Sequence, residues 1–284
     1  MNRLVLSVVL AYAAAAAQHR YPVSGMVLSL DRAHQSMIVS HSGIAGYMDA
    51  MTMEFRVPSL SVLAELHAGD AVAFTLVVDA RNSRAEDIRV TKFDSTERDP
   101  VQADRLKLLS QLLETSAAAR LSPGDQVPSF TLTDQTNRPV TFSAFAGKVV
   151  ALNFVYTRCP LPDYCFRLSN NFGQLQKRFG PNAGLVLLTV TFDPSNDRPD
   201  VLARYAQIWK ADPSYWHFLT GPPADIQRLC ALFGVGYWPD EGLFIHSLHT
   251  AVIDREGKLV ANLEGNRYTS QQLGDLVETV LRSR

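Results

Sequence analysis

The chain has 284 residues, with 27 basic and 28 acidic side chains, a formal net charge of −1 and no run of Lys or Arg. This length suits two domains, each able to bury its own core, and the charge balance argues against a nucleic-acid-binding protein. With only three cysteines, the chain is not a disulfide scaffold.

The N-terminus has the pattern of a secretory signal peptide, residues 1–17. Arg3 precedes an apolar segment, residues 4–17, that ends in small residues. We therefore expect a periplasmic or otherwise exported protein. An apolar segment of 14 residues is short for a membrane span, so a soluble mature protein is expected, with an uncleaved signal anchor as the alternative. No later segment reaches membrane-spanning length.

Residues 22–93 contain short apolar segments separated by turn-forming residues. Five such strands in this span predict a small antiparallel, OB-like β-barrel. The expected strands are residues 23–30, 36–41, 51–57, 71–78 and 88–93.

Soft metal ligands cluster within this predicted barrel. Met48, Met51 and Met53 are three of the six methionines, and His41 precedes them. On a strand, Met51 and Met53 point to the same face, where two thioethers can clasp Cu(I) or Ag(I) and an imidazole can complete the site. The alternative is that the methionines fill gaps in a small core and His41 is a surface residue.

These residues resemble the small periplasmic copper-binding domain of the CusF type, whose motif is a His followed further along by Met-Thr-Met. His41, Met51 and Met53 fall on the motif positions, so the resemblance implies a Cu(I) or Ag(I) site on a five-stranded barrel. Founding members of that family place a Trp three residues before the first ligand Met, where this chain has Met48. Either a third thioether replaces the Trp cap, or the site is more open.

Residues 94–123 are expected to form a helical linker. Pro100 begins it, a stripe of leucines at helical spacing continues it, and Pro123 followed by Gly124 ends it. The stripe consists of Leu106, Leu109, Leu112 and Leu113.

From residue 124 to 284 strands alternate with helices, which predicts an α/β domain. The expected strands are residues 130–133, 140–142, 149–156, 185–192, 250–254 and 258–263, and the expected helices begin near residues 168, 201, 223 and 270.

Cys159 and Cys165 lie in the loop between a buried strand and an amphipathic helix. Thioredoxin-like folds carry their functional residues at this position. The N-terminus of the helix stabilises a thiolate, which both redox exchange and metal ligation require. Five residues separate the cysteines, unlike a C-x-x-C motif, so a structural disulfide or two unconnected thiols is the alternative. Cys230 has helical spacing with apolar neighbours and is expected to be a buried core residue.

Three loops are expected to meet beyond the strand ends, at residues 159–165, 193–197 and 244–249. Two thiolates and one imidazole suit copper in either oxidation state. The remaining candidates for the imidazole are His246 and His249. Asp193 and Asp197 could accept hydrogen bonds behind the ligands or contribute to partner docking, or an Asp could cap the next helix.

The second domain resembles the SCO/SenC copper proteins, thioredoxin-like factors that assist assembly of the binuclear copper centre of cytochrome c oxidase. The resemblance is carried by NFVYTRCP with DYC, by TFDPSNDRPDVLARYA and by HSLHTAVIDREG. It implies that Cys159, Cys165 and His246 are copper ligands and that His249 is a bystander. Three residues separate the cysteines in that family, against five here, and Phe166 stands where a Pro commonly follows.

The sequence therefore predicts an exported protein that collects Cu(I) at one site and delivers copper from the other to an apo-cuproenzyme, such as the copper subunit of an oxidase. The alternative is a thiol-disulfide oxidoreductase that reduces client cysteines through Cys159 and Cys165, with His246 tuning the thiolate. A peroxidase of the peroxiredoxin type fits less well, because only Arg158 separates Thr157 from Cys159.

Overall fold

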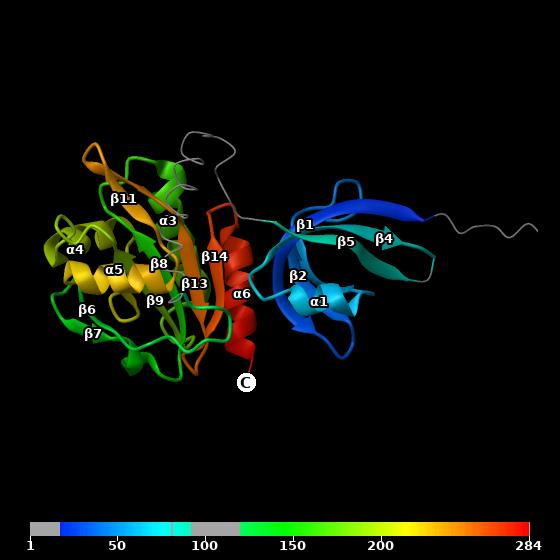
Figure 1. Cartoon of the computed structure of the whole chain (residues 1–284), viewed down its shortest axis with the longest axis horizontal. Coiled ribbons are helices and arrows are strands. Elements are labelled where there is room, and N and C mark those ends of the chain that lie inside the picture. The colour runs from blue at the N-terminus through cyan, green and yellow to red at the C-terminus, as the bar shows by residue number, and fades with distance from the viewer. Residues whose placement is uncertain (1–17, 81, 92–119, 284) are drawn as a thin grey trace, which may run out of the picture.

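The structure is a computed structural model that describes residues 18–80, 82–91 and 120–283. These residues form two domains, with helix α6 (Ser270–Arg282) on the side of the second domain that faces the first (Figure 1). The predicted signal peptide and residues 94–119 of the predicted linker lie outside the described residues. Residues 120–123, the described end of that linker, are not helical.

The first domain is a five-stranded antiparallel sheet in the order β3-β2-β1-β4-β5. Its edge strands β3 and β5 approach each other, but no backbone pairing between them closes the sheet in the described part of the chain. The predicted OB-like barrel therefore stays a prediction. The strands are β1 (His19–Asp31), β2 (Ser36–His41), β3 (Met51–Arg56), β4 (Ala71–Val78) and β5 (Ser83–Thr91).

A short helix that the sequence analysis did not predict, α1 (Leu60–Glu65), follows β3. The side chain of Ser59 caps its N-terminus by accepting a hydrogen bond from the backbone N–H of Val62. Leu63 is the buried residue of this helix and joins the core of the first domain.

The second domain is built on a seven-stranded sheet in the order β14-β13-β8-β9-β10-β6-β7. Strands β8, β9 and β10 run parallel at its centre, where β8 and β9 are buried along their whole length, as their continuous apolar sequences require. The strands are β6 (Thr131–Asp134), β7 (Pro139–Thr141), β8 (Val149–Val155), β9 (Leu185–Thr191), β10 (Trp216–Thr220), β13 (His249–Ile253) and β14 (Leu259–Glu264).

Helices cover this sheet, and a separate two-stranded hairpin lies beside it. Helices α3 and α6 pack against each other, and both contact β8. The remaining elements are the short helical turns η3 (Phe142–Phe145) and η4 (Pro162–Phe166), the helices α3 (Arg167–Phe179), α4 (Pro199–Ile208) and α5 (Pro223–Leu232), and the hairpin strands β11 (Tyr237–Asp240) and β12 (Leu243–His246). None of the helices in the described ranges is both long and apolar enough to cross a bilayer.

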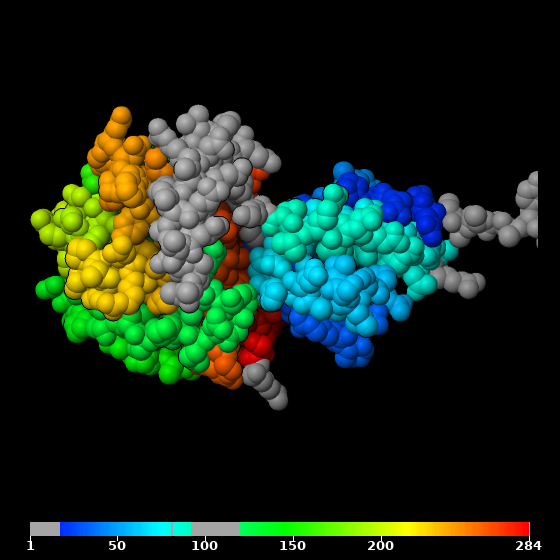
Figure 2. All heavy atoms as spheres, viewed as in Figure 1, coloured from blue at the N-terminus to red at the C-terminus, as the bar shows by residue number. Residues whose placement is uncertain are grey.

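The two domains touch through apolar side chains. Met26, Leu28 and Ala71 of the first domain are buried in one cluster with the core of the second. Gly69 lies so close to β14 that a Cβ atom there would be 2.5 Å from the Cβ of Ala261. Its positive φ of 89° is a second reason for glycine at this position. The contact is visible in the space-filling view (Figure 2).

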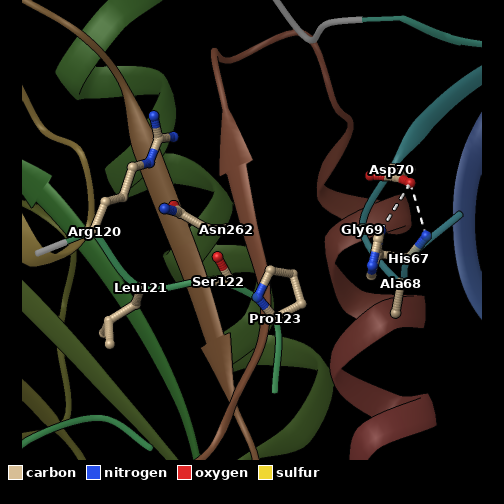
Figure 3. Close-up of a pocket in the computed structure, with 9 residues that line it drawn as sticks. All are labelled: His67, Ala68, Gly69, Asp70, Arg120, Leu121, Ser122, Pro123 and Asn262. Atoms are coloured by element: carbon tan, nitrogen blue, oxygen red, sulfur yellow. Dashed lines mark hydrogen bonds and ion pairs between the residues drawn. The ribbon is translucent and has the colours of Figure 1, made fainter. Parts of the chain in front are cut away.

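A polar hollow of about 430 Å³ opens beside this contact. Residues 67–70 of the first domain form one side, and residues 120–123 and Asn262 of the second form the other (Figure 3). None of the predicted metal ligands lines the hollow.

Candidate metal centres

The three donors of the predicted second centre come together at one end of the central strands. One ligand atom each from Cys159, Cys165 and His246 lie within 4.8 Å of one another. The Cys165 sulfur is 3.6 Å from Nε2 of His246. Cys165 and His246 are buried, whereas Cys159 is partly exposed. The geometry brings together side chains that are 81 residues apart in the sequence.

The imidazole of His246 is oriented by its own backbone neighbour. Its Nδ1 lies 3.0 Å from the carbonyl oxygen of Ser247, which can only accept a hydrogen bond. Nδ1 therefore carries the proton, and Nε2 turns its lone pair toward Cys165. His246 ends β12, so the β11–β12 hairpin delivers this ligand.

A π-helical turn accommodates the five-residue spacing of the cysteines. The chain leaves β8, and the turn η4 (Pro162–Phe166) leads directly into α3. Tyr164 within the turn is non-helical, with φ −108° and ψ −111°. Cys165 lies within this turn, two residues before α3 begins, and is buried.

The two cysteines differ in acidity. A hydrogen bond from the Cys165 thiol lowers the pKa of Cys159 to about 4. Burial, together with the neighbouring Cys159 sulfur, raises the pKa of Cys165 well above its ordinary value. The metal-free site therefore holds one thiolate and one thiol at neutral pH. A metal ion that binds both sulfurs must displace the proton of Cys165.

Aromatic rings that the sequence analysis did not single out surround His246. The Tyr156 ring stands edge-on to the imidazole at 5.6 Å between centroids, and the Phe192 ring lies at 4.8 Å. Burial, with a contribution from the charge of Cys159, raises the pKa of Tyr156 to about 12, so its hydroxyl stays protonated. Tyr156 could have been recognised in the sequence as the last residue of the apolar run, three residues before Cys159.

Asp197 holds the start of the cysteine loop. Its carboxylate accepts hydrogen bonds from the backbone N–H and the hydroxyl of Thr157, at 3.0 and 2.5 Å, and from the hydroxyl of Thr191 at 2.5 Å. Asp197 is fully buried, and burial raises its pKa. Its side chain does not cap α4, whose N-cap residue is Arg198.

Asp193 connects the cysteine loop to the hairpin that carries His246. It forms an ion pair with Arg158 at 2.8 Å, and a second Arg158 nitrogen donates to the carbonyl oxygen of Gly242 at 3.2 Å. Gly242 lies in the turn between β11 and β12. Arg158 is thus a site residue that the sequence analysis missed, although its position next to Cys159 could have indicated it.

The donors of the predicted first centre lie on β2, on β3 and in the loop between these strands. His41 is directly opposite Met51 in the antiparallel pair, and Val39 is opposite Met53, so both methionines share the face of His41. Met51 is 47% exposed, whereas Met53 and Met48 are partly buried. Met48 is brought back toward the strands by a bridge to Ile44.

His41 is buried, at 2% exposure, so the alternative that it is a surface residue is wrong. Its Nδ1 lies 2.7 Å from the carbonyl oxygen of Ser42 and therefore carries the proton. Its Nε2 is buried and has no hydrogen-bond partner within the described ranges. A buried nitrogen lone pair without a partner is costly, and a metal ion would satisfy it. Nitrogen and thioether donors suit a soft monovalent ion.

The candidate ligand His249 and the third cysteine, Cys230, lie outside the centres. His249 is buried on β13, with Nδ1 3.2 Å from the side-chain oxygen of Asn262. Cys230 is buried in the core on α5, and burial raises its pKa. Neither belongs to the group of converging donors.

Two family models match separate parts of the chain. The family model described as SCO1/SenC matches residues 118–281, and that of the copper binding periplasmic protein CusF matches residues 20–90. A Stutzerimonas stutzeri protein described as copper-binding is 30% identical over 164 residues, covering 55% of this chain and 76% of the relative. A SCO1 protein homolog of Bacillus subtilis is 28% identical over 145 residues, covering 49% and 74%.

Solved structures share the fold of the second domain. A SCO1/SenC family lipoprotein of Bacillus anthracis aligns with a TM-score of 0.51 at 25% identity, covering 57% of this chain and 99% of the other. BsSco, described as a member of the Sco family of cytochrome c oxidase assembly proteins, aligns with a TM-score of 0.50 at 23% identity, covering 58% and 98%. These alignments confirm the thioredoxin-like fold. Copper, the predicted cofactor, is the metal named for the CusF model and the Stutzerimonas relative.

Proposed function

The chain belongs to the SCO1/SenC family, and from this premise we propose that it is an exported carrier that binds copper at two centres and delivers it to a copper enzyme. The first centre consists of His41, Met51 and Met53, with Met48 beside them. The second consists of Cys159, Cys165 and His246. Export is supported by the apolar N-terminal segment and by the match to a protein described as periplasmic.

The observation that carries the proposal is the convergence of two sulfurs and one imidazole nitrogen within 4.8 Å. Sulfur ligands favour Cu(I), and an imidazole keeps Cu(II) accessible, so this donor set can hold copper in either state. Cys159 is the partly exposed member of the three. We assign it as the ligand from which copper passes to the recipient, because ligand exchange needs an accessible donor.

The first centre has the donors for capturing Cu(I). Thioether sulfurs carry no proton, so two methionines bind a soft ion without a deprotonation step. Met51 is exposed and can meet incoming copper, whereas His41 is buried with its Nε2 unsatisfied. We propose that this centre collects scarce Cu(I) and that the second centre passes copper on.

The proposed recipient is an apo-cuproenzyme such as the copper subunit of cytochrome c oxidase. The description of BsSco as belonging to a family of oxidase assembly proteins supports this choice. Exposed apolar side chains lie close in sequence to the ligands of the second centre, and exposed apolar surface is typical of docking sites. They are Leu161, Phe166 and Leu243.

We expect the reduced, signal-free protein to bind two copper ions and the Cys159→Ser, Cys165→Ser variant to bind one. The wild type should also show a thiolate-to-Cu(II) charge-transfer band that the variant lacks, because only a coordinated thiolate produces it. Copper per protein by elemental analysis and the absorption spectrum after Cu(II) addition measure both effects.

Cys230→Ala is the matched control, because it removes a buried thiol that is not one of the converging donors and should leave the copper content and the band unchanged. Equal copper content in the double-serine variant and the wild type would contradict the proposal.

A second function, thiol-disulfide exchange, is favoured by the low pKa of Cys159 beside the Cys165 thiol. The Cys159 thiolate would attack a client disulfide and release one client thiolate. Cys165, losing its proton, would then displace the second client sulfur. The client would leave as a dithiol, and a Cys159–Cys165 disulfide would form.

His246→Ala separates the two functions. If the centre binds copper, the variant should lose tight copper binding at the second centre, because one of three donors is gone. Thiol-disulfide exchange should stay within about threefold, because the main hydrogen bond to Cys159 comes from Cys165. Copper titration and the rate of disulfide reduction in a model peptide measure the two activities, and His249→Gln serves as the control. Unchanged copper affinity in His246→Ala would exclude His246 as a ligand.

A further inference from the structure

The ligand strands of the first centre have a second face, and that face is turned toward the second domain. In the β2–β3 pair, Ser40 is directly opposite Thr52, between the pairs that carry the ligands. Successive side chains of a strand point to opposite faces. The hydroxyls of Ser40 and Thr52 therefore lie on the reverse side of the hairpin from His41, Met51 and Met53.

A single carboxylate oxygen of the second domain accepts hydrogen bonds from both hydroxyls. Oδ2 of Asp275, on α6, accepts hydrogen bonds from Ser40 Oγ at 2.8 Å and from Thr52 Oγ1 at 3.0 Å. One turn earlier on the same helix, Gln272 donates to the carbonyl oxygen of Ser40 at 3.2 Å. The side chain of Asp275 is 13% exposed, and of its two hydroxyl partners Ser40 is buried whereas Thr52 is exposed.

Asp275 is itself held in place from a third element. Its other oxygen, Oδ1, accepts a hydrogen bond from Arg178 at 2.8 Å, and Arg178 also pairs with Glu278 on the same face of α6. Arg178 lies in the last turn of α3, the helix that begins just after Cys165. Contacts within the second domain therefore hold the Asp275 carboxylate in position independently of its hydrogen bonds to the first domain.

This arrangement depends on the register of β3. A shift of β3 by one residue would bring a methionine opposite Ser40 and turn Thr52 to the ligand face. Asp275 would then lose one of its two hydroxyl donors. The strand needs such a constraint, because β3 lies at the edge of the sheet and His41–Met51 is the last pair of its ladder with β2.

We infer that Asp275 is a positioning residue of the first metal centre. By binding Ser40 and Thr52 it keeps His41, Met51 and Met53 in the register that clasps a soft ion. The second domain thereby sets the affinity of the centre in the first. The inference rests on the metal role proposed above for these three ligands.

Silver(I) binding to the Cys159→Ser, Cys165→Ser protein tests the inference, because this parent lacks the sulfur ligands of the second centre. Thr52→Val should weaken silver(I) binding about tenfold, the value of one hydrogen bond to a charged group, and Asp275→Ala should weaken it at least as much, because it removes the bonds from both hydroxyls. Thr52→Val keeps the size and β-branching of the side chain and removes only the donor. Competition titration gives the dissociation constants, and methyl resonances of methionine report whether Met51 and Met53 still bind the ion.

Glu278→Ala is the matched control. It removes the other carboxylate that pairs with Arg178, and among the described residues Glu278 has no hydrogen bond to the first domain. Its silver(I) affinity should stay within about twofold of the parent, a difference below one hydrogen bond. In a Ser40→Ala, Thr52→Val background, Asp275→Ala should cause no further loss, because the residue acts through these hydroxyls. A general loss of stability would not produce this pattern.

The outcomes are separable. If Thr52→Val and Asp275→Ala bind silver(I) as tightly as Glu278→Ala, the positioning role is overturned and the first centre stands. If the parent itself binds no silver(I), the proposed centre fails and the positioning role fails with it. If Asp275→Ala does not fold, Thr52→Val alone decides between these results.

Discussion

At the scale of single residues, the two centres prepare their imidazoles in the same way. His41 is followed by Ser42 and His246 by Ser247, and in each case Nδ1 lies within 3.0 Å of the carbonyl oxygen of that serine. The carbonyl group of the following serine thereby fixes both the tautomer and the orientation of the imidazole ring, which leaves the lone pair of Nε2 for a metal ion. A side chain prepared in this way loses little freedom when the metal binds.

The acidity of Cys159 leads to a pH prediction for the metal-free, reduced protein. Its pKa of about 4 makes it a thiolate at all higher pH values, so its reactivity should persist on acidification. We expect iodoacetamide to alkylate Cys159 at a nearly constant rate from about pH 8 to about pH 5, with a fall only near pH 4, whereas an ordinary thiol loses reactivity below about pH 8.5.

Mass spectrometry of the alkylated peptides measures these rates. Cys230 provides the internal comparison, because it is buried and its pKa is raised, so it should stay unmodified in the folded protein. A Cys159 rate that falls about tenfold for each pH unit below 8 would contradict the low pKa.

At the scale of elements, a two-residue turn places His246. Asp240 pairs with Leu243, so Glu241 and Gly242 alone connect β11 to β12, and both have positive φ, at 47° and 82°. This is the geometry of a type I′ hairpin turn. The sequence analysis missed this hairpin, because its strands are short and one contains Pro239, which weakens a strand prediction.

The turn η4 lies where the spacing of the two cysteines differs from the family pattern. Five residues separate Cys159 from Cys165, where three are usual in the family that the second domain resembles, and three of the five lie in the π-helical turn η4. The sulfurs still converge with His246. Residue spacing alone was therefore a weak guide to whether the donors could meet.

At the scale of the whole molecule, α6 and the segment before it contact the surroundings of both centres. Asn266 donates a hydrogen bond to the carbonyl oxygen of Asp163 in the cysteine loop, and Gln272 donates to that of Ser40, next to His41. The domains also share an apolar cluster. Direct packing of the domains, rather than linker length alone, therefore controls how the centres are placed relative to each other.

This placement bears on copper transfer within one molecule. If the first centre feeds the second, a Met51→Ala, Met53→Ala variant should load its cysteine centre about tenfold more slowly when Cu(I) is scarce, because capture then depends on the second centre alone. The rate of Cu(I) appearance at the thiolates, followed by their ultraviolet absorption at less than one equivalent of copper, measures this effect.

With excess copper the variant and the wild type should reach the same loading, which controls for damage to the second centre. Equal loading rates at scarce copper would show that the first centre does not supply the second.

The types of donor and most of the central elements of the second domain could be predicted from the sequence. Two of these patterns are local: an apolar run followed by Cys159 and Cys165, and a Met-x-Met spacing on a strand. Each depends only on neighbours along the chain, so it can be recognised without knowledge of the fold. The same holds for β8, β9 and α3, whose continuous or helical apolar patterns agree with the elements observed.

Which distant residues meet depends on the tertiary fold. Residue spacing and chemistry left His246 and His249 as equal candidates, and the family resemblance chose between them; the fold places His246 against Cys165, 81 residues away. Thr52 and Asp275, 223 residues apart, meet because Met26 and its neighbours dock the first domain on the second. Such contacts depend on the packing of whole surfaces, for which no pattern in a single stretch of sequence is sufficient.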